Sequence, residues 1–332
     1  MKKIILFCAT MILSFLIVGC GKQGEKDLIK DLSKKVDNSS GYYLTGELEI
    51  MNNEESYLYD VEVSYEKEEN FKVSLKNKTN NHEQIILKNS EGVYVLTPSL
   101  NKSFKFQSEW PYNNSQTYLL QVLIDDINND EEKIFEQKDD GYIITAKANY
   151  SNNNELVKQK IYIDKDNNFN KVEVLDSNDN IKIRMVFKSV DMGATFDKDY
   201  FKLENCMDSA NVLEENAPVF NIDEIIFPMY VPDNTYLYSQ DKVSVDNGER
   251  VILTFDGDKP FVLVQETVRK SSDLIIPVSG EPSMVLDTIG SLSDSSVSWV
   301  SNGIEYYVIS DVMSKNELLE VARSISVIPV SK

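Results

Sequence analysis

The chain has 332 residues and a formal net charge of −20, with 54 acidic side chains against 34 basic ones. This acidic balance argues against partners such as nucleic acid and anionic lipid headgroups, which attract basic proteins. The composition includes one histidine and three cysteines, so a Ser/His/Asp triad could use only His82, and a zinc site would need mostly carboxylates.

The first twenty residues combine a basic start, an apolar run and a cysteine. Lys2 and Lys3 precede an apolar stretch that ends in Ile17-Val18-Gly19-Cys20. The stretch is too short to span a bilayer, and the pattern resembles a bacterial lipoprotein signal peptide. We expect residues 1–19 to be removed and Cys20 to carry acyl chains such as palmitate, which would hold the protein on the outer face of the cytoplasmic membrane. A plain secretory signal is the alternative.

The other cysteines fit export without an internal disulfide. Cys8 leaves with the signal peptide and Cys20 is expected to be acylated, so no internal disulfide is expected at Cys206. Its neighbours Glu204 and Asp208 should raise the pKa of the Cys206 thiol, because a nearby negative charge disfavours the thiolate. We interpret this cysteine as incidental rather than reactive.

Residues 20–205 predict an antiparallel sheet with two helices. Apolar residues at helical spacing indicate one helix over 25–38 and a second over 115–127, the latter capped by Ser115. Apolar and polar residues alternate in the segments between them, which is typical of strands. The predicted strands are 42–50, 59–65, 71–75, 84–88, 92–97, 102–107, 142–150, 157–163, 171–176 and 182–189. The simplest packing is an α+β fold in which an open antiparallel β half-barrel wraps around the helices.

The periodicity is lost near residue 205 and returns beyond residue 222. Residues 206–222 are rich in Asn, Asp and Glu and contain Pro218, which predicts a linker. Residues 223–332 then predict a smaller α+β domain with strands at 235–238, 250–255, 261–267, 284–300 and 304–310. Ser314 and Glu317 form the pattern of a capping box that opens the last helix. We expect limited proteolysis in the linker to release two folded fragments.

Three patterns that could carry chemistry have simpler explanations. The segment Asp164–Asn170 places oxygen ligands at alternating positions, but Phe169 stands where a calcium loop needs Gly, and Leu175 where it needs Glu. A hairpin turn is therefore expected. His82 is interpreted as a surface residue at a strand edge. The carboxylate pairs Asp125-Asp126 and Glu131-Glu132 are interpreted as solvated, so the sequence predicts no catalytic residue, no metal site and no cofactor beyond the lipid.

Aromatic residues in the middle of the first domain are the candidates for binding. They are Tyr94, Phe104, Phe106, Trp110 and Tyr112. On the concave face of a half-barrel such residues either line an apolar cavity for an acyl chain or fill the core under the helices. If the domain grips a protein partner instead, exposed aromatics near Trp110 and Tyr112 should be the anchors.

The stretch from Gln84 to Pro111 resembles the middle of the sporulation and germination lipoproteins of endospore-forming Firmicutes, the YdcC-like and GerS-like proteins. Through them residues 20–205 resemble the LolA/LolB lipoprotein-carrier fold. The resemblance implies a non-catalytic lipoprotein, located at the cytoplasmic membrane or in the forespore envelope, which supports spore cortex peptidoglycan processing by binding a cortex N-acetylmuramoyl-L-alanine amidase. The alternative is a lipid or lipoprotein binding module that uses the half-barrel cavity.

The second domain resembles a different family. The segments Val231–Tyr236, Gly303–Ser310 and Ser314–Leu319 are similar to an exported domain of unknown function of the DUF4367 type. This resemblance implies no activity.

Overall fold

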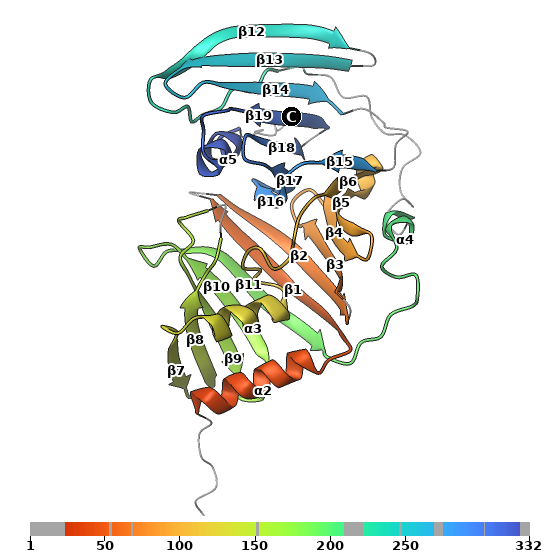
Figure 1. Ribbon diagram of the computed structural model, residues 1–332, viewed down its shortest axis with the longest axis vertical. Helices are drawn as coiled ribbons and strands as arrows, with labels where there is room; N and C mark the ends of the chain where they lie inside the picture. Colours follow the sequence, from red (N-terminus) through yellow and green to blue (C-terminus); the bar gives the residue numbers. More distant parts are fainter. Residues whose placement is uncertain are drawn as a thin grey trace, which may run out of the picture.

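The computed structural model describes residues 24–52, 55–67, 69–150, 153–208, 222, 224–245, 248–268, 275–301 and 303–325. Cys20, the predicted lipidation site, lies outside these residues. Two sheets are arranged end to end along the long axis, with the second sheet above the open end of the first (Figure 1).

The lower sheet has twelve strands in the order β15-β6-β5-β4-β3-β2-β1-β11-β10-β9-β8-β7. Its members are β1 (Gly41–Asn52), β2 (Glu55–Glu66), β3 (Asn70–Asn77), β4 (Glu83–Asn89), β5 (Gly92–Thr97), β6 (Lys102–Phe106), β7 (Ile134–Lys138), β8 (Gly141–Lys147), β9 (Lys158–Asp164), β10 (Phe169–Leu175), β11 (Ile181–Asp191) and β15 (Ile276–Val278), with the turn η2 (Pro98–Leu100) between β5 and β6. Neighbouring strands from β1 to β11 pair antiparallel. The sheet stays open, because β7 and β15 end the order without pairing to each other.

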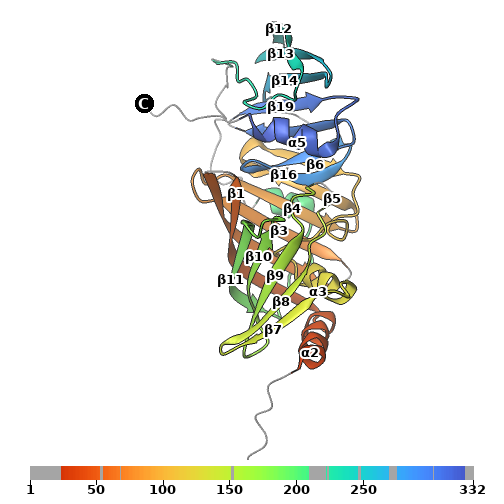
Figure 2. The ribbon, with the colours of Figure 1, turned by 90° about the vertical axis from the view of Figure 1, so that its left-hand side faces the viewer.

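The helices α2 (Glu25–Asp37) and α3 (Leu120–Asn129) fill the concave side of this sheet (Figure 2). On α2, Leu28, Leu32 and Val36 are buried one turn apart, because a spacing of four residues keeps them on one face. They share one core with inward side chains of the strands, among them Tyr42 and Phe71, both fully buried. The prediction of an open α+β half-barrel around helices is therefore confirmed, and its interior is filled by side chains.

The second helix begins later than predicted. Ser115 does not cap it, because the Ser115 hydroxyl accepts a hydrogen bond from the backbone N–H of Asn149 at 2.7 Å and the Ser115 N–H donates to the Asn149 carbonyl at 2.7 Å. These bonds hold residue 115 in a loop, and the helix starts at Leu120.

The outer side of β4 and β5 is covered as well. The segment after β11 ends in the short helix α4 (Leu203–Asp208), and its residues Phe201, Leu203 and Cys206 pack on Tyr94 and its neighbours. Both faces of these strands are therefore buried, which explains their continuous apolar sequence. Burial is the main cause that raises the pKa of the Cys206 thiol, and the charge of Glu204 adds less, which corrects the cause that the sequence suggested.

The upper sheet has seven strands in the order β12-β13-β14-β19-β18-β17-β16. They are β12 (Thr235–Val245), β13 (Gly248–Gly257), β14 (Phe261–Thr267), β16 (Glu281–Val285), β17 (Thr288–Leu292), β18 (Ser296–Ser301) and β19 (Ile304–Ile309). The predicted strand at 284–300 is wrong, since two turns divide that segment among β16, β17 and β18. The turn after β16 places Leu286 at a φ of 54°, a left-handed backbone conformation that alternation of apolar residues does not reveal.

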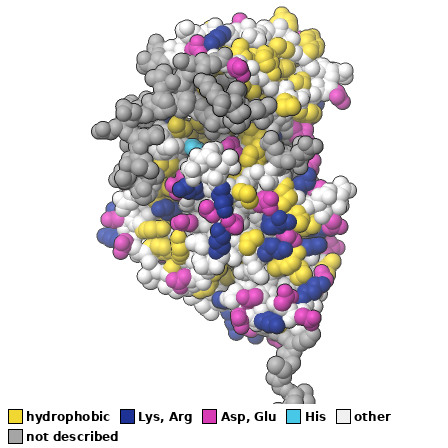
Figure 3. All heavy atoms as spheres, turned by 180° about the vertical axis from the view of Figure 1, so that it is seen from behind, with side chains coloured by type: hydrophobic (Ala, Val, Ile, Leu, Met, Phe, Trp, Pro, Cys, Tyr) yellow, Lys and Arg dark blue, Asp and Glu magenta, His cyan; other side chains and the backbone are white. Residues whose placement is uncertain are grey.

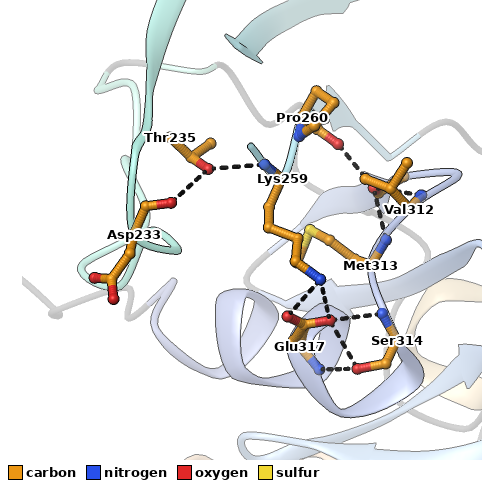
Figure 4. A network of polar contacts seen from close by, with 9 residues as sticks. Asp233, Thr235, Lys259, Pro260, Val312, Met313, Ser314 and Glu317 are labelled. Atoms are coloured by element: carbon orange, nitrogen blue, oxygen red, sulfur yellow. Dashed lines mark hydrogen bonds and ion pairs between the residues drawn. The ribbon is translucent and has the colours of Figure 1, made fainter. Parts of the chain in front are cut away.

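The last helix, α5 (Lys315–Arg323), packs under this sheet and starts as predicted. Ser314 and Glu317 form the capping box: the Ser314 hydroxyl accepts from the Glu317 N–H, and the Ser314 N–H donates to the Glu317 carboxylate at 2.8 Å. Lys259 adds an ion pair to the same carboxylate at 3.1 Å, which joins the helix start to the β13–β14 turn (Figure 4). These contacts stabilise the charged form of Glu317 and lower the pKa of its carboxyl.

Strand β15 belongs to the second domain by its position in the sequence and to the first sheet by its pairing. It lies beyond the predicted linker in sequence but pairs parallel with β6, with Ile276 opposite Phe104 and Val278 opposite Phe106. Two buried polar contacts lie nearby: Gln84 bonds to Thr288 and Ile289, and Lys102 pairs with Glu305 at 3.3 Å. From the sequence we expect cleavage in the linker to release two fragments. From these contacts we expect the two halves to stay associated after cleavage.

The predicted linker is shorter than expected at its start. Residues 206–208 belong to α4 and, with the buried Cys206, pack on the half-barrel. At the other end, Ile222 is buried in the core of the second domain, and its N–H donates to the Glu249 carboxylate at 3.1 Å. Residues 209–221 lie outside the described residues.

Candidate functional site

A cavity of about 210 Å³ lies where the second domain meets the open end of the half-barrel. Its walls come from the ends of β1, β2 and β11, from the loops around residues 110–118 and 150–156, and from β16 and α5. Apolar side chains dominate the wall: Ile50, Tyr57, Ile86, Trp110, Tyr118, Ile183, Met284 and Ile289. A concave apolar site with a few polar groups is the usual form of a ligand site.

Three charged side chains border this cavity, and they differ in exposure. Arg323, in the last turn of α5, is half-buried, and one of its guanidinium nitrogens donates to the Met284 carbonyl at 3.4 Å. Lys182 is half-buried and lies 3.7 Å from the carboxylate of Asp176, whereas Glu155 is exposed. Burial lowers the pKa of the Arg323 guanidinium, and the charge of Glu155 opposes this shift. The cavity therefore has a positive group at its inner wall.

The five aromatic residues predicted for binding lie in different places. Tyr94 is buried on the outer side of the sheet under α4, not in the cavity. Phe106 is buried in the core of the half-barrel, and Phe104 is half-buried on the same strand, beside β15. Trp110 is 2% exposed and reaches the cavity wall, so it is not a surface anchor. Tyr112, at 43% exposed, is the one member of this set that is open to solvent.

The residue that sequence reasoning missed is Arg323. Its position in the last turn of a helix is common for basic residues, because the helix dipole favours a cation there. Nothing in that pattern distinguishes a surface arginine from one that lines a cavity. Only the placement of α5 above the half-barrel brings Arg323 into the wall of the cavity that Trp110 and Glu155 also line.

His82 lies at the junction of the domains rather than on an open strand edge. It is half-buried, and burial lowers the pKa of its imidazole while the charge of Asp287 opposes that shift. Burial likewise raises the pKa of the Asp287 carboxyl, which accepts a hydrogen bond from Asn80 at 3.2 Å. The histidine hydrogen-bonds through Nδ1 to Ser99 at 3.4 Å. These contacts connect the β3–β4 turn to the β16–β17 turn.

The remaining sequence candidates are structural. Asp164–Asn170 forms the β9–β10 hairpin turn, in which the Asp164 carboxylate accepts from the N–H groups of Asp166 and Asn168 at 2.8 Å each. Asp126 is not solvated as predicted: Gln159 donates to its carboxylate at 2.6 Å, and burial raises the pKa of its carboxyl. No group of three or more His, Cys, Asp or Glu side chains within the described residues could hold a metal ion.

The face of the molecule seen from behind shows no extended field of one charge over the described residues (Figure 3). Seen from behind, basic and acidic side chains alternate over the half-barrel, whereas apolar side chains gather near the top of the second domain (Figure 3). The exposed aromatics Tyr236 and Tyr238 lie on β12 at that end. None of the described helices has the length and apolar character needed to cross a membrane.

The fold and this site define a class: an open α+β half-barrel joined to a second sheet, with a ligand-sized cavity at the junction. The curated sporulation protein YdcC of Bacillus subtilis strain 168 is 33% identical to this chain over 327 residues, which cover 97% of this chain and 96% of that protein. The chain belongs to the family of that sporulation protein. No protein-family model matches the chain, so the resemblance of the second domain to the DUF4367 type stays a prediction.

Solved structures with a similar arrangement were also found. The CwlD amidase from Clostridioides difficile in complex with the GerS lipoprotein matches with 17% identity and a TM-score of 0.31, covering 52% of this chain and 98% of the matched chain. A LolA superfamily protein, NE2245 from Nitrosomonas europaea, matches with 10% identity and a TM-score of 0.31, covering 53% and 98%. Scores this low carry no argument about function.

Proposed function

We propose that this protein is a membrane-anchored, non-catalytic lipoprotein of sporulation or germination, which supports modification of the spore cortex peptidoglycan by binding a cortex N-acetylmuramoyl-L-alanine amidase. The observation that carries the proposal is the relationship to a sporulation protein over nearly the whole chain, both domains included. The class of partner comes from the resemblance of the segment from Gln84 to Pro111 to the GerS-like lipoproteins; GerS itself is solved in complex with the CwlD amidase.

The histidine and the cysteine among the described residues both hold the structure together, which supports a binding role. His82 hydrogen-bonds to Ser99 near the domain junction, and Cys206, on α4, is fully buried against β4 and β5 with the pKa of its thiol raised by burial. A buried thiol with a raised pKa is a poor nucleophile, because the thiolate is the reactive form. The protein is therefore better suited to hold a partner than to carry out chemistry.

The membrane anchor depends on one sulfur atom. Because Cys20 is the cysteine that follows Ile17-Val18-Gly19, Cys20→Ala should prevent acylation and removal of the lipoprotein signal. Cell fractionation and mass spectrometry of the N-terminus should show the variant as an uncleaved or non-acylated form. Recovery of a processed, acylated Cys20→Ala variant would show that the lipoprotein assignment is wrong.

Tyr112 is the aromatic side chain best placed to meet a protein partner from the half-barrel. Its ring packs edge-on against Phe71 at 6.4 Å between centroids, and Lys88 lies 5.3 Å from the ring centroid, held by an ion pair to Glu69 at 2.7 Å. The ring is thus supported on one side and exposed on the other. A tyrosine that is held in place loses little conformational freedom on binding, which is why such residues often dominate interfaces.

The test measures capture of a purified cortex amidase by the immobilised chain and by two variants. Tyr112→Ala should weaken binding by about tenfold or more, the effect typical of an interface anchor of about 2 kcal/mol. Tyr238→Ala is the matched control, because this tyrosine is 71% exposed but lies on β12 at the far end of the molecule (Figure 1). Absence of any amidase binding by the unmodified chain would refute the proposed function. If Tyr238→Ala weakened amidase binding and Tyr112→Ala did not, the interface would lie on the second domain.

A further inference from the structure

Buried side chains of the described residues fill the interior of the half-barrel, whereas a cavity lies at the junction of the two domains. Side chains from α2, α3 and the strands fill the interior, and Leu28, Tyr42 and Leu123 among them are fully buried. The cavity of about 210 Å³ lies instead between the end of this sheet and the second domain. A dry apolar cavity of about 150 Å³ can hold benzene, so this one accommodates a single alkyl segment and not two.

Both domains contribute apolar side chains to the wall of the cavity, beside polar residues such as Asn114 and Gln116. Trp110 and Ile86 contribute from the half-barrel, and Met284 and Ile289 from β16 and β17. All four are buried or half-buried, so an apolar occupant would exchange water contacts for contacts with these side chains. Neither domain alone forms the enclosure.

The cation at the wall has more hydrogen-bond donors than partners. A guanidinium carries five N–H donors and keeps its charge in proteins. Within the described residues, Arg323 has one hydrogen bond, to the Met284 carbonyl at 3.4 Å, and no carboxylate within 4.0 Å. A half-buried cation without a close counter-ion is costly, because burial removes its hydration. An anionic group on the ligand would supply the missing partner.

The charge around the opening favours an anion as well. Lys182 borders the cavity, and its own carboxylate partner Asp176 is at 3.7 Å, near the limit of an ion pair. Glu155 also borders the cavity, but it is exposed to solvent, where water screens its charge. The charges of Glu155 and Glu320 both act on Arg323, but within the described residues neither carboxylate lies within ion-pair distance of the guanidinium. Lys182 already has Asp176 as a partner, so the anionic head of a ligand is expected at Arg323.

We propose that the junction cavity binds a single-chain anionic amphiphile, with its carboxylate or phosphate on Arg323 and its alkyl chain against Trp110, Met284 and Ile289. This site is separate from the surface proposed for the protein partner, and it replaces the interior cavity that the sequence suggested. Two kinds of ligand fit this description, a free fatty acid and a lysophospholipid. Both have one acidic headgroup and one alkyl chain.

Trp110 makes binding directly observable. The chain contains two tryptophans, and Trp299 stacks on Tyr306 at 5.1 Å in the second domain. Trp299→Phe keeps an aromatic ring there and leaves Trp110 as the single tryptophan. The experiment uses the Trp299→Phe chain from Gly21 onwards, which keeps every described residue. It is titrated with dodecanoate, with lauroyl lysophosphatidic acid and with dodecanol, each below its micellar concentration. The fluorescence of Trp110 is recorded during each titration.

At least one of the two anions should bind and shift Trp110 emission, and Arg323→Gln should weaken that binding by about tenfold or more, because hydrogen bonds to a charged group are lost. Arg250→Gln is the matched control, since this arginine pairs with Glu266 on the second sheet and does not line the cavity. If only dodecanoate binds, the ligand is a fatty acid. If only lauroyl lysophosphatidic acid binds, the ligand is a lysophospholipid.

Three results would overturn the proposal: no binding of either anion, equal affinity of Arg323→Gln and Arg250→Gln, or binding of dodecanol as tight as that of the anions. Ser283→Phe, which adds a ring to the cavity wall from β16, separates this site from non-specific adsorption and should abolish the signal while circular dichroism stays unchanged. An unchanged signal in Ser283→Phe would also refute the site. The amidase test uses Tyr112 and is independent of these outcomes.

Discussion

Trp110→Ala is expected to lower the free energy of unfolding by about 3 to 5 kcal/mol, the range for truncating a buried large aromatic side chain. The ring is 2% exposed and packs edge-on against Phe71 with 5.9 Å between centroids, inside the core of the half-barrel. Its removal takes apolar surface out of the core and enlarges an existing cavity, so the structure can close the gap only in part. Urea unfolding followed by circular dichroism measures the change.

Tyr112→Ala is the control for this experiment. Tyr112 lies two residues away in the same loop but is 43% exposed, so its truncation should cost about 1 kcal/mol or less. If Trp110→Ala left stability unchanged and instead abolished amidase binding, Trp110 would be a surface anchor and the packing described above would be wrong. A large loss from Tyr112→Ala would contradict its exposure.

Gln84→Ala is expected to lower the free energy of unfolding by about 2 to 4 kcal/mol and to weaken the attachment of the second domain. The Gln84 carboxamide is 5% exposed, accepts from the Ile289 N–H at 2.6 Å and the Thr288 hydroxyl at 3.0 Å, and donates to the Ile289 carbonyl at 3.2 Å. The Gln84 amide also donates to the Thr97 hydroxyl at 3.4 Å. Alanine leaves these four buried polar groups without this partner, and each such group costs about 1 to 3 kcal/mol, although the costs are not additive.

The effect on the domain junction is measured after cleavage between α4 and residue 222. The two halves of the unmodified chain should migrate together in size-exclusion chromatography, because β15 stays paired with β6 and Lys102 with Glu305. The halves of Gln84→Ala should separate at lower denaturant concentration. Asn80→Ala is the matched control, since it removes an exposed hydrogen bond to Asp287 across the same junction. Equal behaviour of both variants, or separation of the unmodified halves in buffer, would contradict this prediction.

Local patterns in the sequence predicted the half-barrel well, because its strands and helices each bury one face. The alternation at Phe71, Val73 and Leu75 and the helical spacing of Leu28, Leu32 and Val36 correspond to buried positions in the structure. The capping box at Ser314 and Glu317 is also formed as predicted. Such signals are local, since a strand or helix needs only its own period to present an apolar face.

Prediction failed where a distant segment changed the environment. Tyr94 was expected to face a cavity or partner, but α4 returns over the outer side of β5 and buries it. Ser115 was expected to cap a helix, but its hydroxyl accepts a hydrogen bond from the backbone N–H of Asn149, 34 residues away in the sequence. Asp126, on α3, was expected in solvent, but Gln159 donates a hydrogen bond to its carboxylate from strand β9. Hydrogen bonds and packing between distant residues leave no period in the sequence.

The sequence by itself determined most strands and helices of the half-barrel, its open form and the family, because local periodicity and extended similarity are properties of the chain. Only the tertiary structure decided where a ligand could bind. The cavity exists because β15 extends the first sheet and Gln84 bonds to β17, which together hold β16 and α5 over the open end of the half-barrel. That placement brings Arg323 and Trp110 to one cavity wall although they are 213 residues apart in the sequence. A cavity is defined by the side chains that enclose it, and here they come from both domains, so neither domain's sequence could reveal it.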